Sequence, residues 1–295
     1  MPKQKWGKGF DVKGLETSSR YLWRPEFVPL LMRYLDIKPG QTVVDVGCGT
    51  GVFSRVLARG MKGNVRVIGI DHDEKLLRVA RKVTKVEGLQ DITYRYGDIE
   101  SLPLEDDAVD RVVCQKVLWI PKDARLALKE MIRVCKPGGL VGGVEVAWDH
   151  VIWYFPGNPR LTELREKYSA AYVRRQRMVG ADRGIGYKLP GMMHELGLSR
   201  VRLDGYPFIW YEADDRIPLE AKLAQYRMEL AMYRKNYVNE YVKWLRGMMS
   251  REELTELMEL DSKWLRSLVR NPKRIESDYH VNAAIFFIAT GRKPK

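Results

Sequence analysis

The chain has few of the residues on which disulfide frameworks and metal centres depend. It contains three cysteines and four histidines in 295 residues. Cys48, Cys114 and Cys135 are odd in number and form no C-x-x-C pair, whereas disulfide frameworks and structural zinc sites need paired cysteines. The sequence therefore predicts neither a disulfide framework nor a metal site, and it agrees with the reducing conditions of the cytoplasm.

Long hydrophobic runs are absent as well. The longest apolar run, Ala283 to Ala289, is much shorter than the roughly 20 residues that a membrane-spanning helix needs. Residues 1–8 contain three lysines and no apolar stretch of the kind that forms the core of a signal peptide. We therefore expect a soluble, cytoplasmic protein with no membrane segment.

Acidic residues are too few to balance the basic ones. The chain has 51 Lys and Arg against 38 Asp and Glu, a net charge of +13. The excess is concentrated in residues 1–38, with eight bases and four acids, and in residues 160–188, with eight bases and three acids. A basic surface that displaces counterions from phosphates favours a nucleic-acid partner, although such a surface can also serve solubility alone.

Short apolar runs alternate with helical patterns in the first half of the chain. This alternation is typical of a parallel sheet with helices on both faces, and the chain is long enough to bury one large core and a cap. The expected strands are residues 43–46, 65–70, 92–96, 110–114 and 140–146, and the expected helices are residues 52–58, 73–87 and 122–135.

A glycine-rich loop follows the first expected strand. The run VVDVGCGTG, residues 43–51, leaves the strand after Asp45 and places glycines at 47, 49 and 51. Glycine has no Cβ, so the backbone can turn sharply and a ligand can approach the main chain. A dinucleotide fingerprint would need glycine at position 52, where Val52 stands. The loop therefore favours a nucleoside ligand without a pyrophosphate.

Acidic residues follow the next two expected strands. Asp71 ends the strand at residues 65–70, where an acid can accept hydrogen bonds from ribose hydroxyls. Gly97-Asp98-Ile99 follows the third strand, and a Pro-Gly-Gly turn at residues 137–139 precedes the fifth. In this order, the motifs resemble those of the class I S-adenosylmethionine-dependent methyltransferases, whose motif I corresponds to VVDVGCGTG.

The resemblance implies an α/β fold with a Rossmann-like seven-stranded methyltransferase sheet, helices on both faces, and a mainly helical cap built from insertions. It also implies an enzyme, an S-adenosylmethionine-dependent methyltransferase. The residues expected to bind S-adenosyl-L-methionine on this basis are Asp45, Gly47, Gly49, Gly51, Asp71, His72, Asp98, Ile99 and Gln115.

The resemblance continues in pieces beyond residue 147, because two insertions showing helical spacing interrupt it. The expected organisation is an N-terminal lid segment (1–38), the cofactor-binding core (39–147), a basic helical insertion (148–188), a continuation of the core (189–205), a helical cap insertion (206–281) and a closing strand (282–295).

Aromatic and basic residues are interleaved in the segments expected to cover the acceptor. Aromatic faces beside cations suit the stacking of an extruded or single-stranded base, and they equally suit an apolar pocket for a small molecule. The candidate substrate-binding residues are Tyr21, Trp148, Trp153, Arg174 and Arg175.

Methyl transfer from a sulfonium is an in-line displacement, so alignment of the reactants matters more than a strong base. Gln115 could accept a hydrogen bond from an amino group or contact the cofactor, Trp119 could stack on a ring, and Glu145 could accept a proton. These are the candidate catalytic residues. The run from Cys114 to Trp119 departs from the Asn/Asp-Pro-Pro-aromatic motif of enzymes that methylate amino nitrogens of bases, which leaves the target atom open.

Three functions are compatible with these features. The basic segments favour methylation of a base nitrogen in structured RNA, either rRNA or tRNA, and this is the function we expect. The alternative is a small-molecule methyltransferase of the quinone, sterol or amine type, in which motifs such as Leu102-Pro103-Leu104 are common. A non-catalytic cofactor-binding protein is the third, and the intact motif set argues against it.

Overall fold

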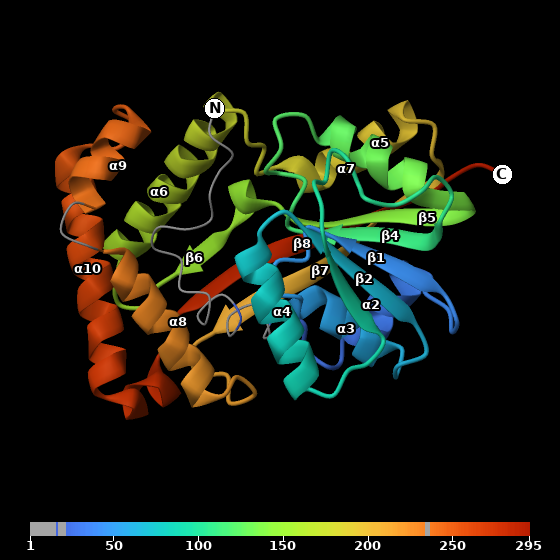
Figure 1. Cartoon of the computed structure of the whole chain (residues 1–295). Coiled ribbons are helices and arrows are strands. Elements are labelled where there is room, and N and C mark those ends of the chain that lie inside the picture. The colour runs from blue at the N-terminus through green and yellow to red at the C-terminus, as the bar shows by residue number, and fades with distance from the viewer. Residues whose placement is uncertain (1–15, 17–21, 234–236) are drawn as a thin grey trace. The chain divides into compact units, whose positions relative to one another are not determined.

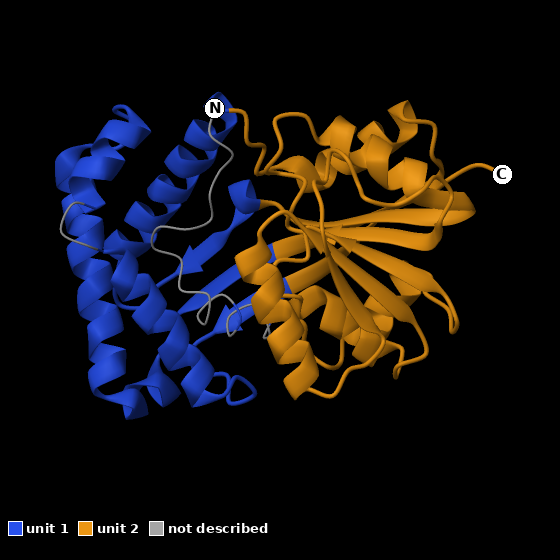
Figure 2. Cartoon of the chain, viewed as in Figure 1, with its two compact units in different colours: residues 1–22, 148–179, 208–284 blue, residues 23–147, 180–207, 285–295 orange. Residues whose placement is uncertain are grey.

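The structure is a computed structural model that describes residue 16 and residues 22–233 and 237–295. Tyr21, a candidate substrate-binding residue, lies outside these described residues. The chain forms two compact units, coloured separately in Figure 2. Unit 1 comprises residues 1–22, 148–179 and 208–284, and unit 2 comprises residues 23–147, 180–207 and 285–295.

A mostly parallel sheet forms the centre of unit 2 (Figure 1). Strands β2 and β3 lie on one side of β1, whereas β4 and β5 lie on the other, so the strand order reverses between β1 and β4. Ligands of open α/β sheets bind at the carboxyl ends of the strands at such a reversal. The five parallel strands are β1 (Thr42–Val46), β2 (Arg66–Asp71), β3 (Ile92–Tyr96), β4 (Val109–Gln115) and β5 (Cys135–Val146).

The last strands add antiparallel pairing. Strand β8 (Val281–Arg292) pairs antiparallel with β5, and β7 (Ser199–Tyr211) pairs with β8. The expected α/β sheet with helices on both faces is confirmed, but the described residues contribute eight strands to it where seven were expected. The additional strand is β6 (Ile152–Tyr154), whose three β-branched or aromatic residues pair antiparallel with β8.

The helices of unit 2 cover both faces of its sheet, with α5 and α7 on one face and α2 and α3 on the other (Figure 1). Two of these helices, α4 and α5, are capped by aspartates at their N-termini. Asp73 accepts a hydrogen bond from the Lys75 backbone N–H, and Asp123 accepts one from the Arg125 backbone N–H. The helices are α2 (Val28–Tyr34), α3 (Val52–Gly60), α4 (Glu74–Val86), α5 (Ala124–Val134) and α7 (Ile185–Glu195).

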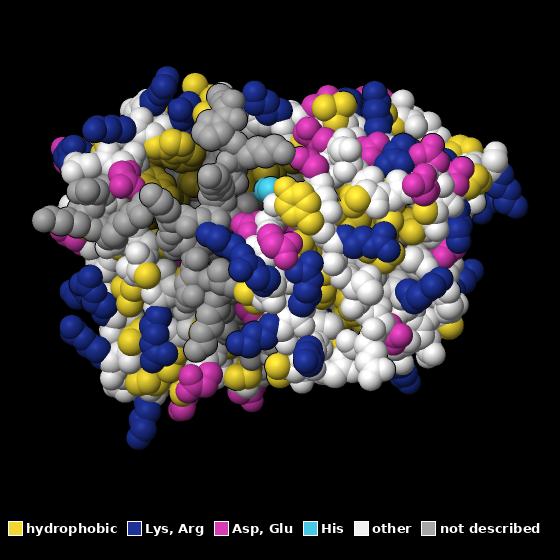
Figure 3. Space-filling model, in the orientation of Figure 1, with side chains coloured by type: hydrophobic (Ala, Val, Ile, Leu, Met, Phe, Trp, Pro, Cys, Tyr) yellow, Lys and Arg dark blue, Asp and Glu magenta, His cyan; other side chains and the backbone are white. Residues whose placement is uncertain are grey.

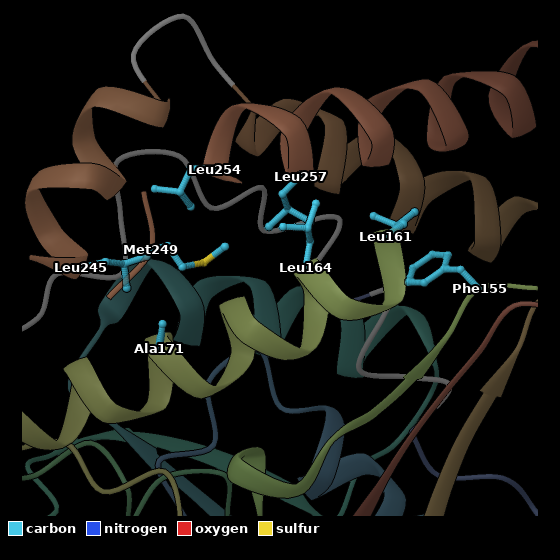
Figure 4. Close-up of a cluster of buried hydrophobic side chains, with 8 residues drawn as sticks. All are labelled: Phe155, Leu161, Leu164, Ala171, Leu245, Met249, Leu254 and Leu257. Carbon is cyan, nitrogen blue, oxygen red and sulfur yellow. The ribbon is translucent and has the colours of Figure 1, made fainter. Parts of the chain in front are cut away.

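Unit 1 is mainly helical. Its elements, apart from β6 and the ends of β7 and β8, are α6 (Pro159–Met178), α8 (Leu219–Met232), α9 (Tyr237–Leu245), α10 (Arg251–Arg270) and the short 3-10 helices η1 (Trp148–His150) and η2 (Pro272–Ser277). Apolar side chains from α6, α9, α10 and the segments that precede α6 and α10 pack into a buried cluster, which Figure 4 shows: Phe155, Leu161, Leu164, Ala171, Leu245, Met249, Leu254 and Leu257. Within the described part of the chain, we find no helix with the length and apolar character needed to cross a bilayer.

Candidate active site

The glycine-rich loop leaves β1 at the carboxyl ends of the parallel strands. Its three glycines, at 47, 49 and 51, have φ angles of 70°, 55° and 76°, a region that residues with a Cβ rarely adopt. The Gly47 N–H donates to the Ile70 carbonyl at 2.7 Å, which fixes the start of the loop to β2. The glycines are therefore required by the backbone conformation of the loop itself.

Space is also limited at the first glycine. A Cβ on Gly47 would lie 2.5 Å from Cγ2 of Val117, whereas a Cβ on Gly49 would meet no atom within 4 Å. We expect Gly47→Ala to lower the free energy of unfolding by about 2 kcal/mol or more, and Gly49→Ala by only about 1 kcal/mol, because the second change adds strain without overlap. Urea unfolding of both variants tests this, and equal losses would contradict the role of Val117.

Asp71 connects the loop to the next strand. Its Oδ2 accepts a hydrogen bond from the Gly49 N–H at 2.8 Å, and its Oδ1 accepts one from the Asp73 N–H at 2.9 Å. Each carboxylate oxygen has further lone pairs, so the same group can also accept hydrogen bonds from two ribose hydroxyls. His72 lies beside it, with Nδ1 3.8 Å from Asp71 Oδ1. Asp71 thus has a structural role that its position in the sequence does not reveal.

Asp45 is buried under the loop. Its Oδ2 accepts a hydrogen bond of 2.6 Å from the Ser54 hydroxyl on α3. Burial raises the pKa of the Asp45 carboxyl to about 7, and the nearby charge of Asp71 adds to this rise. The contact with Ser54 holds α3 against β1, so it helps to fix the loop between them. Direct contact of Asp45 with the cofactor stays a prediction.

Asp98 and Ile99 follow β3 at the same edge of the sheet. The Gly97 N–H donates to the Asp71 carbonyl at 3.1 Å, and Asp98 Oδ1 accepts from the Glu100 N–H at 3.0 Å. Both Asp98 and Ile99 are half-buried. Asp71 and Asp98 thus follow β2 and β3 at the edge of the sheet where the glycine loop lies. Their contacts with the ribose hydroxyls and the adenine amino group stay predictions.

The turn after β4 brings the three candidate catalytic residues together. Glu145 on β5 is fully buried, and its Oε1 accepts hydrogen bonds of 2.8 Å from the N–H groups of both Val117 and Leu118. Gln115 ends β4, and the Trp119 Nε1–H donates to the Lys116 carbonyl at 2.9 Å. Glu145 therefore shapes the turn that lies between Gln115 and Trp119.

Burial also changes the acidity of groups at this turn. It raises the pKa of Glu145 to about 7, although the two backbone N–H groups and the Lys116 charge oppose that rise. It lowers the pKa of Lys116 to about 8, and the Arg183 charge lowers it further while Glu145 opposes. Lys116 and Arg183 were not among the candidate residues, because neither the burial of Lys116 nor the position of Arg183 beside Trp119 can be seen in the sequence.

The other candidate substrate-binding residues lie in unit 1. They are Trp148, Trp153, Arg174 and Arg175. Arg165 lies over the Trp153 ring at 4.9 Å, and the buried Arg175 lies 6.0 Å from the Trp244 ring centroid, so these side chains take part in the packing of unit 1. Arg174 is exposed and Trp148 is half-buried. Their contact with a substrate stays a prediction.

Metal-binding groups are not assembled at this site. Within residues 16, 22–233 and 237–295, no three His, Cys, Asp or Glu side chains are placed to hold a metal ion. Adenosine recognition beside the glycine loop stays a prediction.

Comparison with known proteins identifies relatives of this chain. A family model described as a methyltransferase domain matches residues 43–139, which include the glycine loop, Asp71 and Asp98. An uncharacterized 37.1 kDa protein in transposon TN4556 of Streptomyces fradiae is 36% identical over 127 residues, which are 43% of this chain and 36% of that protein. The chain thus spans well under two thirds of that relative.

Two further relatives are covered more fully. Demethylmenaquinone methyltransferase of Bacillus cytotoxicus is 30% identical over 194 residues, which are 63% of this chain and 80% of that enzyme. The structure of phosphoethanolamine N-methyltransferase 2 of Haemonchus contortus, in complex with S-adenosyl-L-methionine, matches with a TM-score of 0.54 at 16% identity, over 98% of this chain and 58% of that one. This second likeness concerns the fold.

Proposed function

Because the chain belongs to the class I S-adenosylmethionine-dependent methyltransferases, we propose that it transfers the methyl group of this cofactor to a small molecule of the quinone type. The enzyme class and the cofactor predicted from the motifs are confirmed. The observation that carries the choice of acceptor is the 30% identity with demethylmenaquinone methyltransferase across 80% of that enzyme.

The described residues have distinct parts in this function. When bound, S-adenosylmethionine supplies an electrophilic methyl carbon that a nucleophile displaces in line. Asp71, fixed by the N–H groups of Gly49 and Asp73, accepts hydrogen bonds from ribose hydroxyls. Asp98 accepts one from the adenine amino group. Glu145 fixes the turn after β4, beside which the acceptor binds.

In residues 160–188, one of the two basic segments that favoured RNA, most of the bases are buried or paired within the protein. Arg175 is buried, and five other bases of residues 160–188 form ion pairs: Arg160 with Glu256, Arg165 with Asp261, Lys167 with Glu253, Arg177 with Asp149, and Lys188 with Asp182. On the face shown in Figure 3, the coloured Lys and Arg side chains are scattered, with Asp and Glu between them. The acids that pair with these bases reduce the net positive charge that the segment offers to phosphates, which supports the small-molecule acceptor over RNA.

Transfer of a labelled methyl group tests the proposal. The purified protein is incubated with methyl-labelled S-adenosylmethionine and an extract of cells that lack the gene, and the label is then measured in the organic-soluble fraction and in RNA. We expect label in the organic-soluble fraction, at the mobility of a quinone. Incubation without the protein is the control, and label in RNA alone would refute the proposal.

A further inference from the structure

A pocket lies at the amino ends of β1, β4 and β5, at the end of the sheet opposite the glycine-rich loop. Its volume is about 280 Å³, and its lining comes from the residues between α2 and β1, from the first residues of β4 and β5, and from the end of β8. All of these residues belong to unit 2. Because ligands of open α/β sheets bind at the carboxyl ends of the strands, the pocket is separate from the expected cofactor site. The charged residues of the lining are Asp36, Lys38, Asp110, Arg111, Lys136 and Arg292.

Basic side chains outnumber acidic ones in this pocket. The lining holds four Lys and Arg residues and two Asp residues, so it carries two positive charges in excess. Asp36 is shared by three of the bases. Its carboxylate forms ion pairs with Arg111 at 3.2 Å and with Arg292, and it lies 3.8 Å from the Lys38 ammonium. One carboxylate cannot neutralise three cations, so positive charge remains at this wall of the pocket.

Arg111 is a buried cation with a fixed position. Its Nε donates to the Asp36 carbonyl at 2.9 Å, and its Nη1 donates to the Asp110 carbonyl at 2.8 Å. Burial lowers the pKa of Arg111; the charge of Asp36 opposes this, and the positive charge of Arg292 lowers the pKa further. The two guanidinium groups therefore repel each other, and an anion in the pocket would offset that repulsion.

The two lysines retain hydrogen-bond donors for a ligand. Within the described residues, Lys136 Nζ donates to Asp110 Oδ1 at 3.0 Å, which uses one of its three N–H groups. Lys38 Nζ lies 3.8 Å from Asp36, which is too far for a hydrogen bond. The side chains of Lys136 and Lys38 are 46% and 65% exposed, so a ligand that enters from solvent can reach both ammonium groups.

We propose that this pocket binds a phosphate dianion, either as free inorganic phosphate or as the phosphate group of a phosphomonoester. Such a group carries a charge of about −1.5 to −2 at pH 7 and has three strong acceptor oxygens. It therefore matches both the two charges in excess and the donors of Lys38 and Lys136, whereas a carboxylate would leave one of the two charges unopposed. Phosphate binding here is independent of methyl transfer at the other end of the sheet, so the test of one does not decide the other.

Phosphorus NMR of two probes tests the inference. The full chain is first saturated with S-adenosylhomocysteine, so that the cofactor site is filled, and is then titrated with inorganic phosphate and with ribose 5-phosphate at neutral pH. We expect the signal of at least one probe to broaden with a dissociation constant of about 1 mM, the value that two hydrogen bonds to charged groups would give. Tighter binding of ribose 5-phosphate would indicate a phosphomonoester as the ligand, and tighter binding of inorganic phosphate would indicate the free ion.

Matched lysine variants show whether the pocket is the site of binding. Lys38→Met and Lys136→Met each remove hydrogen-bond donors and one positive charge, so each should weaken binding about tenfold. Lys82→Met removes an exposed lysine of α4, outside the pocket, and should bind phosphate as the wild type does. Undiminished affinity for S-adenosylhomocysteine shows that each variant is folded.

Asp110→Asn should have the opposite effect. Asparagine keeps an oxygen for the Thr42 N–H, which donates to Asp110 Oδ2 at 2.9 Å, but it carries no charge. The positive charge of the pocket then increases, so phosphate should bind about threefold more tightly. No broadening of either probe by the wild type, unchanged binding in both lysine variants, or unchanged affinity in Asp110→Asn would overturn the inference.

Discussion

Replacing Asp71 with alanine should weaken S-adenosylmethionine binding about 100-fold, because hydrogen bonds to a charged acceptor each contribute about 1.5–3 kcal/mol. The change removes the acceptor for ribose hydroxyls and also the anchor of the Gly49 and Asp73 N–H groups. The loop would then have to be ordered by the ligand itself. Isothermal titration with S-adenosylhomocysteine measures the loss.

Two variants separate these effects from a general disturbance. Asp71→Asn keeps one acceptor oxygen, so its affinity should fall between those of the wild type and Asp71→Ala. Asp91→Ala removes an exposed aspartate before β3 and should leave the affinity unchanged. Wild-type affinity in Asp71→Ala would show that Asp71 neither holds the loop nor binds ribose.

The stability of the protein should fall as the pH rises, and Glu145 should account for up to about 3 kcal/mol of that fall. Its pKa is raised from an ordinary 4.5 to about 7, so the native state retains a proton that the unfolded chain releases. Its contribution is therefore complete below pH 4.5 and is lost as the pH rises through 7. Asp45, whose pKa is also raised to about 7, acts in the same direction.

Glu145→Gln is the matched test of this pH dependence. Glutamine keeps an oxygen for the Val117 and Leu118 N–H groups but cannot ionise. Urea unfolding between pH 4 and pH 8 should show a smaller loss of stability in Glu145→Gln than in the wild type, with the Asp45 contribution left in place. The pKa values of Asp36 and Asp110 are lowered, so these two groups make the stability rise with pH. They do so equally in the wild type and in Glu145→Gln. Identical profiles would mean that Glu145 ionises normally.

The sheet and the cofactor could be predicted because their signals are local. The loop of residues 47–51 stands between a strand and a helix in the sequence as in the structure, and Asp71 and Asp98 follow their own strands directly. Ordered motifs of this kind do not depend on contacts with distant residues. The family and the fold can therefore be predicted from the sequence alone.

The acceptor was harder to predict because its determinants are long-range. The basic count of residues 160–188 favoured RNA, yet Arg160 and Arg165 are paired with acids 96 residues further along the chain. The role of Glu145 also depends on N–H groups 27 and 28 residues before it. A charge or a carboxylate in the sequence does not show which partner will neutralise it.

The position of β8 between β5 and β7 has a consequence for biosynthesis. A ribosome makes β5 and β7 first and β8 afterwards, so both older strands emerge with an open hydrogen-bonding edge. The nascent chain cannot complete its sheet until residues 281–292 have been translated. During that interval, chaperones and proteases can reach edges that the finished enzyme covers.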